Sequence, residues 1–298
     1  MDRRSFFRVS GLSAALVAAG GSIPGRALLA KTRRKSHFSI LQISSVTDTI
    51  GNSYLLRTSG GKVIMIDGGF ESEAENLRSK IAAAGNHVDL WFLTHPHQDH
   101  MGAFSVILAD RRGITVDKVI YSRVPDSFLD YEKANAEDAR RYYRILDSVT
   151  EATDIIDLHR TGQRFDIDGI GIMVLGVSNP DIRSHAYNDQ SMIIRFWDSE
   201  KSLVILGDAG PECGNICLSK YPEELDCDYL QVSHHGQNGC DEHFYRTVSF
   251  RACLWPTPSW VWEPENPSLT TRTTRRWMDE KGITEHHPSC IEKDWLLK

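Results

Sequence analysis

The residues best able to do chemistry lie together in the segment THPHQDH, which occupies positions 94–100. Four of its side chains are of the metal-ligating type, namely His95, His97, Asp99 and His100. At the extended end of a strand, His95 and His97 point the same way and can hold one ion. Asp99 and His100 follow where we expect the chain to turn into a helix, so they can face a second ion. Imidazole and carboxylate are ligands of Zn²⁺, and they also suit Mn²⁺ or Fe.

Two later segments can supply the remaining ligands of a binuclear site. The apolar run LVILG at 203–207 leads to Asp208, and a carboxylate at the end of a strand can bridge two cations. The run at 229–233 ends at the pair His234 and His235. One histidine of this pair can ligate a metal while the other donates to a developing oxyanion. The sequence does not separate these two roles, and we favour His235 as the ligand.

The pattern of apolar residues predicts alternating strands and helices around these motifs. The runs at 54–58 and 63–67 flank a Gly-Gly turn and predict a hairpin. Further strands are expected at 38–43, 89–94, 169–177, 191–197, 202–206, 229–233, 252–255 and 283–286, and helices at 71–85, 101–110, 241–248 and 269–281. We expect 126–153 to form a long polar helix, or two helices, across an outer edge. These elements predict one domain in which helices cover the outer faces of two sheets.

The motifs together resemble one family. Asp67-Gly68-Gly69, the segment 94–100, Gly207-Asp208 and the triplet HHG at 234–236 are similar to the metallo-β-lactamase superfamily, over about residues 38–285. Within it, the strand NDQSMIIR from Asn188 and the HHG ending resemble the hydrolase domain of competence-type DNA-uptake proteins. The surface phosphorylcholine esterases share that ending. The resemblance implies an α/β fold, a single-domain, four-layered αββα sandwich with two metal ions at one edge of its sheets.

Many members of this family supply a third histidine to the first metal, from the stretch between the first motif and the bridging aspartate. Here that stretch offers His159, His185 and Asn188, and the DNA-uptake branch also has asparagine at the last of these positions. His185 is a candidate substitute ligand, although we favour an exposed loop histidine. We interpret His286 and His287 as surface or rim residues rather than ligands.

The candidate residues predict a hydrolytic mechanism. Two cations lower the pKa of a water molecule between them and provide a nucleophile for an electrophilic carbon or phosphorus. The cations and a histidine, His234 here, stabilise the developing negative charge. Asp99 can serve both as a ligand and as a proton acceptor. Asp67 can orient a ligand histidine and fix its tautomer, although a plain turn residue before Gly68 is the alternative.

The substrate class stays open between several esters and amides. The resemblance to the DNA-uptake branch favours hydrolysis of a phosphodiester or related ester. We expect the substrate to be a small molecule or a phosphoester. The alternatives are a lactonase or β-lactamase acting on a cyclic ester or amide, and a non-catalytic metal-binding module. Trp255, Trp260 and Trp262 could form a cage for a choline group, but we favour packing of a proline-rich loop.

The composition is that of a globular domain. Of 298 residues, 41% are hydrophobic and 25% charged, both near the average, which excludes a disordered, collagen-like or multi-span membrane protein. Six cysteines are too few for a small disulfide scaffold. We expect most of them to be buried free thiols.

The first residues of the chain resemble an export signal. Arg3 and Arg4 precede Phe6, and an apolar run at 9–21 leads to small residues up to Ala30. This arrangement is similar to a twin-arginine signal peptide. A basic amphipathic start of a cytosolic protein is the alternative. The apolar run is too short, and too rich in glycine and serine, for a spanning helix, so we expect no stable membrane anchor in the mature form.

The expected boundaries are therefore a signal peptide at 1–30 and the hydrolase domain at 31–298, exported by the twin-arginine machinery to the periplasm or the outside. Removal of the signal takes away four arginines and one aspartate, which changes the net charge from −6 to −9. A protein that binds long nucleic acid needs a basic face. The acidic mature chain therefore disfavours long nucleic acid as a partner.

Overall fold

The computed structural model describes residues 37–129, 131–149, 152–290 and 294–298. The chain divides into two units, and all the described elements belong to the second, residues 35–298. The predicted signal peptide and its boundary at residue 30 lie outside the described residues.

Two seven-stranded mixed sheets form the centre of the second unit. The first has the order β14 (Trp295–Leu297), β1 (Phe38–Gln42), β2 (Ser53–Thr58), β3 (Val63–Asp67), β4 (His87–Phe92), β5 (Thr115–Tyr121) and β6 (Asp154–Asp157). The second has the order β13 (Glu285–Pro288), β12 (Phe250–Trp255), β11 (Cys227–Gln231), β10 (Ser202–Ile205), β9 (Ile194–Trp197), β8 (Ile170–Val174) and β7 (Arg164–Ile167). In each sheet four neighbouring strands are parallel, β3 to β6 and β10 to β13.

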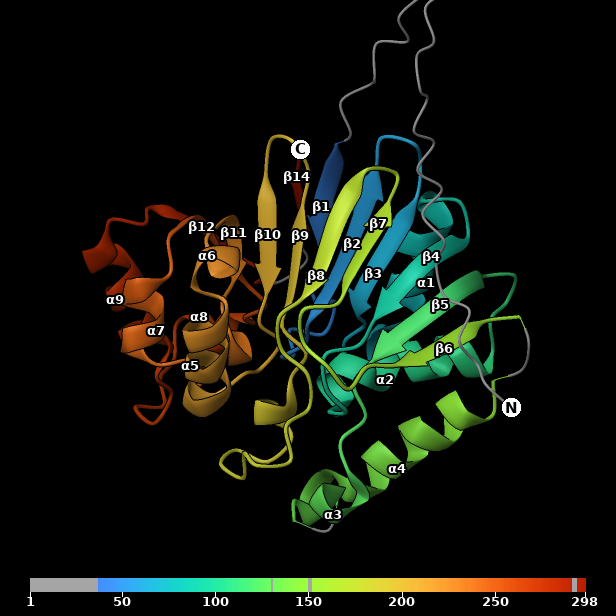
Figure 1. Ribbon diagram of the computed structural model, residues 1–298, viewed down its shortest axis with the longest axis horizontal. Coiled ribbons are helices and arrows are strands. Elements are labelled where there is room, and N and C mark those ends of the chain that lie inside the picture. Colours follow the sequence, from blue (N-terminus) through green and yellow to red (C-terminus); the bar gives the residue numbers. More distant parts are fainter. Residues whose placement is uncertain (1–36, 130, 150–151, 291–293) are drawn as a thin grey trace, which may run out of the picture. The chain divides into compact units, whose positions relative to one another are not determined.

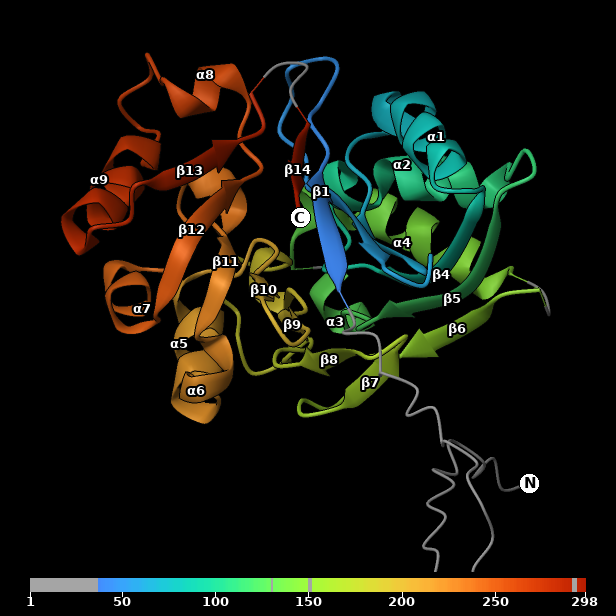
Figure 2. The same cartoon turned by 90° about the horizontal axis from the view of Figure 1, so that it is seen from above.

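Helices cover the outer face of each sheet, as Figures 1 and 2 show. The first sheet carries η1 (Glu71–Glu73), α1 (Ala74–Ala83), α2 (Gln98–Ala109), α3 (Asp126–Leu129) and α4 (Lys133–Asp147). The second carries η2 (Asn188–Gln190), α5 (Pro211–Lys220), α6 (Pro222–Leu225), η3 (His234–Gly236), α7 (Glu242–Thr247), α8 (Ser259–Trp262) and α9 (Thr271–Lys281). No helix among the described residues is long and apolar enough to cross a membrane.

Alternation along the strands produces three apolar layers. In β3, Ile64 and Ile66 enter the core between the sheets, whereas Val63 and Met65 pack under the helices of the first sheet. In β10, Leu203 points to the core between the sheets and Val204 to the helices of the second. Because both faces of these strands are buried, they are continuous apolar runs. The predicted α/β, four-layered αββα sandwich is confirmed.

Several boundaries differ from the predicted ones in a way that affects the site. Helix α2 begins at Gln98 rather than at residue 101, so Asp99 and His100 lie in its first turn. The segment 126–153 contains α3 and α4, and α4 packs Ala139 and Tyr142 into the core instead of only crossing an edge. Strands β5, β6, β7 and β14 were not predicted. The first three contain charged residues and β14 has only three residues, so none of them shows a clear apolar pattern.

Candidate metal centre

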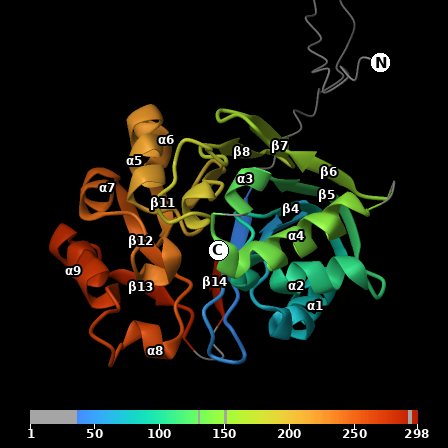
Figure 3. The same cartoon turned by 90° about the horizontal axis from the view of Figure 1, so that it is seen from below.

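All six predicted ligands lie at one edge of the sandwich, where parallel strands of both sheets end. The loop after β4 carries His95 and His97, and α2 begins directly after them. The loops after β10 and β11 carry Asp208 and His235. Figure 3 looks toward this edge and shows α3 and α4 beside it. Carboxyl ends of parallel strands are the usual place for sites in such sheets.

Two groups of ligand atoms form here, and Asp208 belongs to both. Group one contains His95, His97 and Asp208, and group two contains Asp99, His100, Asp208 and His235. In group one, His95 Nε2 lies 3.0 Å from His97 Nδ1 and 3.9 Å from Asp208 Oδ2. In group two, His235 Nε2 lies 2.9 Å from Asp99 Oδ2 and 3.3 Å from Asp208 Oδ2. His100 Nε2 lies 3.2 Å from the other oxygen of Asp208. A carboxylate shared in this way is the arrangement expected of a two-metal bridge.

Hydrogen bonds on the far side of the imidazoles assign their tautomers. His100 Nδ1 donates to Asp67 Oδ2 over 2.7 Å, and His235 Nδ1 donates to the carbonyl of Pro256 over 2.8 Å. When Nε2 has lost its proton to make room for a cation, each bond keeps the Nε2 lone pair directed into the centre. His97 is held the other way round, because its Nε2 lies 3.1 Å from Glu132 Oε1 and its Nδ1 faces His95. Outer partners of this kind raise the basicity of a ligand and fix its orientation.

Asp67 is fully buried and organises the first motif. Its Oδ1 accepts from the backbone N–H of Thr94, and its Oδ2 accepts from Asn52 Nδ2, Thr94 Oγ1 and His100 Nδ1, over 2.7–2.8 Å. Thr94 Oγ1, whose proton goes to Asp67, can then accept from His95 Nδ1 at 3.1 Å. The structure therefore places Asp67 behind two ligand histidines, rather than at a plain turn.

Glu132 was missed by the sequence reasoning. It lies just before α4, and besides contacting His97 it accepts the backbone N–H of Tyr187 over 3.0 Å through its other oxygen. Asn135 also donates to Glu132. No spacing rule connects a glutamate 35 positions away to a histidine motif, so only the fold reveals this contact.

Three residues of the centre have a strained backbone. Asp67, His234 and His235 have φ of 51°, 51° and 54°, in the left-handed region that side chains other than glycine rarely adopt. Gly207, before Asp208, has φ 57°, and a Cβ there would lie 2.9 Å from Thr94 Cβ and Ser191 Oγ. Strain of this kind persists where surrounding contacts over-determine the geometry, typically at functional sites.

The charges in the centre shift the pKa values of the ligands. Burial alone lowers the pKa of His235, but Asp208 and Asp99 raise it to about 10. The same carboxylates outweigh burial at His100 and hold its pKa well above its usual range. Burial raises the pKa of Asp99 and of Asp208. The imidazoles of His100 and His235 lower both pKa values by more, so the net shift is downward. Burial, with repulsion from the neighbouring histidines, lowers the pKa of His95.

The donor set fits divalent cations. His100 Nε2, His235 Nε2 and Asp208 Oδ1 are buried and make no hydrogen bond, and leaving such atoms unpaired is costly. Imidazole nitrogens and carboxylate oxygens are the atoms that Zn²⁺, Mn²⁺ and Fe accept. The residues therefore form two candidate metal-binding clusters joined by Asp208.

The other histidines named from the sequence lie elsewhere, except His234. Its Nε2 lies 3.3 Å from Asn188 Nδ2 at the rim of the centre, while its Nδ1 is buried without a partner. His185 is exposed, and neither it nor His159 belongs to a ligand group among the described residues. His287 lies 2.9 Å from Glu285 instead.

The remaining sequence expectations concern cysteines and tryptophans. All six cysteines are free, and four are buried. Trp255 is buried and packs edge-on against Trp262, whose ring face is covered by Arg275 at 4.4 Å. Trp260 is half-exposed and donates to the carbonyl of Asp48 over 3.1 Å. Two of the three indoles are therefore used in packing, and this arrangement gives no support to a cage.

Comparison with known proteins decides the family. A family model described as the metallo-beta-lactamase superfamily matches residues 46–239, well over half of the chain. The chain belongs to the metallo-β-lactamase superfamily. Members of this superfamily are generally metal-dependent hydrolases, and the chain is an enzyme of that kind. No curated protein matches its sequence.

Solved structures of the metallo-β-lactamase fold are similar in architecture. YhfI of Bacillus subtilis is 13% identical with a TM-score of 0.56, and the match covers 88% of this chain and 100% of YhfI. CmlA, a diiron β-hydroxylase from Streptomyces venezuelae, is also 13% identical with a TM-score of 0.56, over 87% of this chain and 54% of CmlA. Zn²⁺-bound PqqB from Methylobacterium extorquens is 10% identical with a TM-score of 0.50, over 87% of this chain and 99% of PqqB. At these identities the likeness shows the fold alone.

Proposed function

We propose that this metallo-β-lactamase superfamily member is an exported, binuclear-metal-dependent hydrolase of a phosphodiester or related ester. The observation that carries the proposal is the position of Asp208, which faces both ligand groups at once. Zn²⁺ is the proposed metal, because four imidazoles and two carboxylates are its preferred donors. When bound, two such ions supply Lewis acidity and lower the pKa of a water molecule.

The chain's own residues supply the other parts of the proposed reaction. Asp67 and Glu132 hold His100 and His97 in the tautomers that direct a lone pair inward. His234 is the proposed donor to the developing oxyanion. Burial, the largest effect on it, lowers its pKa, so its imidazole is neutral at pH 7 and has one N–H to give. Asn188, 3.3 Å away, positions that ring.

The choice of a phosphoester rests on resemblance and on charge. The segment from Asn188 and the triplet HHG at 234–236 resemble the DNA-uptake branch. The acidic chain, in turn, favours a small phosphoester over long nucleic acid. Hydrolysis of a cyclic ester or amide would use the same centre, and a non-catalytic module would keep the ligands without turnover; both are outcomes of the test below.

The test is a substrate panel with protein whose metal content has been measured. We expect two metal equivalents per chain and hydrolysis of bis-p-nitrophenyl phosphate, with a lactone and a β-lactam compared at equal concentration. His97→Ala should abolish turnover while leaving the fold intact. His159→Ala, at an exposed histidine outside the ligand groups, should keep turnover unchanged. Turnover of the β-lactam or lactone alone would reject the phosphoester. Absence of bound metal, or of any turnover after adding Zn²⁺ or Mn²⁺, would reject the hydrolase.

Export is a separate part of the proposal, and it rests on Arg3, Arg4 and Phe6 followed by the apolar run. Replacing both arginines of the pair by lysine should leave the protein in the cytoplasm in a cell fractionation experiment. Arg8→Lys, outside the pair, is the matched control and should export normally. Equal export of both variants would contradict a twin-arginine signal.

A further inference from the structure

Away from the metal centre, a cavity of 530 Å³ lies between α5 and the loop that follows β8. Its apolar lining comes from both sides: Leu175, Val177 and Ile182 from the loop, and Cys213, Ile216 and Cys217 from the helix. Ile216 is one of the few large apolar side chains that is exposed, at 43%. The volume is within the range of about 300–1,000 Å³ that small-molecule sites occupy.

The charge around this cavity has one sign. Arg160 and Lys220 line it, and among the described residues no aspartate or glutamate does, although acidic residues outnumber basic ones by 40 to 34 in the chain. His159 also lines the cavity, but its ring lies 3.5 Å from the carboxylate of Asp157. Lys220 donates to the neutral hydroxyl of Thr161. Within the described residues, neither Arg160 nor Lys220 has an ion pair with an acid. Both cations are exposed and can meet an anionic group from solution.

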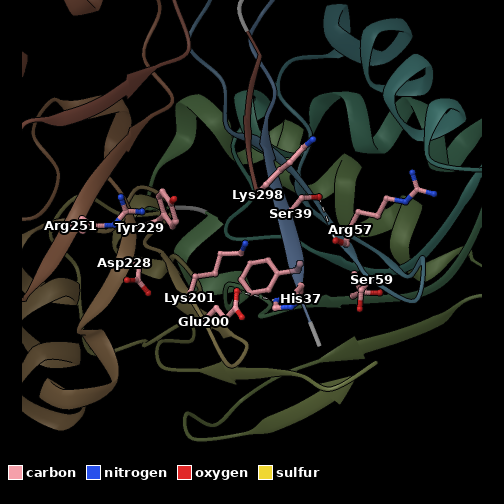
Figure 4. A pocket seen from close by; sticks show the side chains of 12 residues that line it. His37, Ser39, Arg57, Ser59, Glu200, Lys201, Asp228, Tyr229, Arg251 and Lys298 are labelled. Carbon is pink, nitrogen blue, oxygen red and sulfur yellow. Dashed lines mark hydrogen bonds and ion pairs between the residues drawn. The ribbon is translucent and has the colours of Figure 1, made fainter. Parts of the chain in front are cut away.

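The larger cavity, of 710 Å³, is different in this respect. It lies at the ends of the strands that are opposite to the metal centre, and Figure 4 shows acidic and cationic side chains mixed around it. Arg251 there pairs with Glu285 over 2.6 Å, and His37 lies 3.6 Å from Glu200. Arg57, Lys201 and Lys298 have no ion pair among the described residues, but Glu200 and Asp228 lie beside them. This cavity therefore presents charges of both signs to an incoming anion.

Buried side chains hold both walls of the 530 Å³ cavity in place. Gln190 Oε1 accepts from Ser178 Oγ and from the backbone N–H of Asn179, each over 2.8 Å, and its Nε2 donates to the carbonyl of Ile182. Asp189 Oδ1 accepts the backbone N–H groups of Gly210 and Cys213 at the start of α5. Gln190 and Asp189 are themselves fully buried. The cavity is therefore a preformed site, whose ligand need not order its walls.

We propose that this cavity binds an aliphatic carboxylate of several carbons, with its chain against Ile216 and Leu175 and its anionic end at Arg160 and Lys220. An apolar chain gains free energy from burial in the lining. A carboxylate gains charge-assisted hydrogen bonds from the two cations. The inference is independent of the proposed hydrolysis, because it concerns binding at another place. The short element η2 nevertheless contributes to both places. Asn188 faces His234 at the metal centre, and the next two residues, Asp189 and Gln190, hold the walls of this cavity.

The experiment is titration calorimetry of the full metal-loaded protein with octanoate, and with acetate and 1-octanol as probes that lack the chain or the charge. We expect octanoate to bind at least tenfold more tightly than either. The double variant Arg160→Gln with Lys220→Gln should raise the dissociation constant for octanoate at least about tenfold, because both charge-assisted bonds are lost. Arg272→Gln, an exposed cation whose neighbour is Glu263, is the matched control and should bind as the unaltered protein does.

Three results would overturn the proposal: no binding of octanoate, equal binding of octanoate and octanol, or the same dissociation constant in the double variant. Because the variant residues are exposed, its melting temperature should match that of the unaltered protein, which shows that lost binding is not lost folding. The calorimetry requires no turnover, so its failure would leave the hydrolase proposal standing and the reverse also holds.

Discussion

At the residue scale, the centre depends most on the carboxylate that both ligand groups share. Asp208→Asn keeps the size of the side chain, but it removes the negative charge and replaces one of the two ligand oxygens by an NH2 group, which donates and does not ligate. We expect one of the two metal equivalents to be lost and turnover to fall by more than about 100-fold, beyond the 10–100-fold usual for an outer partner. Metal analysis and kcat measure the two effects. Asp154→Asn, whose carboxylate is exposed and paired only with Lys118, is the control. Two retained equivalents in Asp208→Asn would contradict a bridging role.

Glu132 gives a second prediction at this scale, because it lies outside any recognisable motif. Glu132→Ala frees His97 to rotate and to adopt the other tautomer, so metal affinity should fall by about 10–100-fold. Glu132→Gln keeps an oxygen that accepts from His97 Nε2 and should restore most of the affinity. Glu137→Ala, at an exposed residue of α4 that pairs with Arg144, should have no effect. Equal affinity of the Ala and Gln variants would argue that the acid acts by charge and not by orientation.

At the element scale, helix α2 must approach the loop after β3 closely to position Asp99 and His100. A Cβ at Gly102 would lie 2.5 Å from the backbone N of Glu71 and 2.8 Å from the backbone of Phe70. Gly102→Ala should therefore push the helix outward, destabilise the fold by about 1–3 kcal/mol as overpacking does, and weaken metal binding. Gly214→Ala in α5 also crowds a neighbour, Cys240 Sγ at 2.6 Å, but should leave metal affinity unchanged. Melting curves and metal titrations compare the two variants.

The same scale shows what the sequence could and could not predict. Strands buried on both faces, such as β4 and β10, are nearly continuous apolar runs. The sequence could therefore predict where they end, at residues 94–100 and at Asp208. The tautomers were not, because Pro256 and Glu132 approach His235 and His97 only through the fold. The roles of the pair at 234 and 235 also needed the structure, since neighbouring residues share one pattern and differ only in direction. His235 lies in the second group and His234 at the rim, and the assignment of His235 as the ligand stays a prediction.

At the scale of the whole molecule, the centre joins the two sheets. The first sheet and α2 supply His95, His97, Asp99 and His100, and the second sheet supplies Asp208 and His235. Cations held by both sides stabilise the folded state in proportion to RT ln(1 + [L]/Kd). Because the ligand groups come together only in the folded chain, we expect the melting temperature of the domain to rise with metal concentration.

Removing the metal should therefore expose a dependence of stability on pH whose sign follows from the shifted histidines. In chelator-treated protein the pKa of His235 is about 10, against 6.5 for an ordinary histidine, so between these values the folded state binds more protons than the unfolded state. Stability from this group is complete below about pH 6.5 and declines as pH rises toward 10. Metal affinity should change in the opposite direction, because the cation must displace those protons. Melting curves at pH 6, 8 and 9.5, with chelator and with Zn²⁺, should thus diverge as pH rises. His235→Gln should make the decline smaller, and His100, whose pKa is also raised, should account for what is left. Parallel curves in the unaltered protein would mean that protons and cations do not compete for this centre.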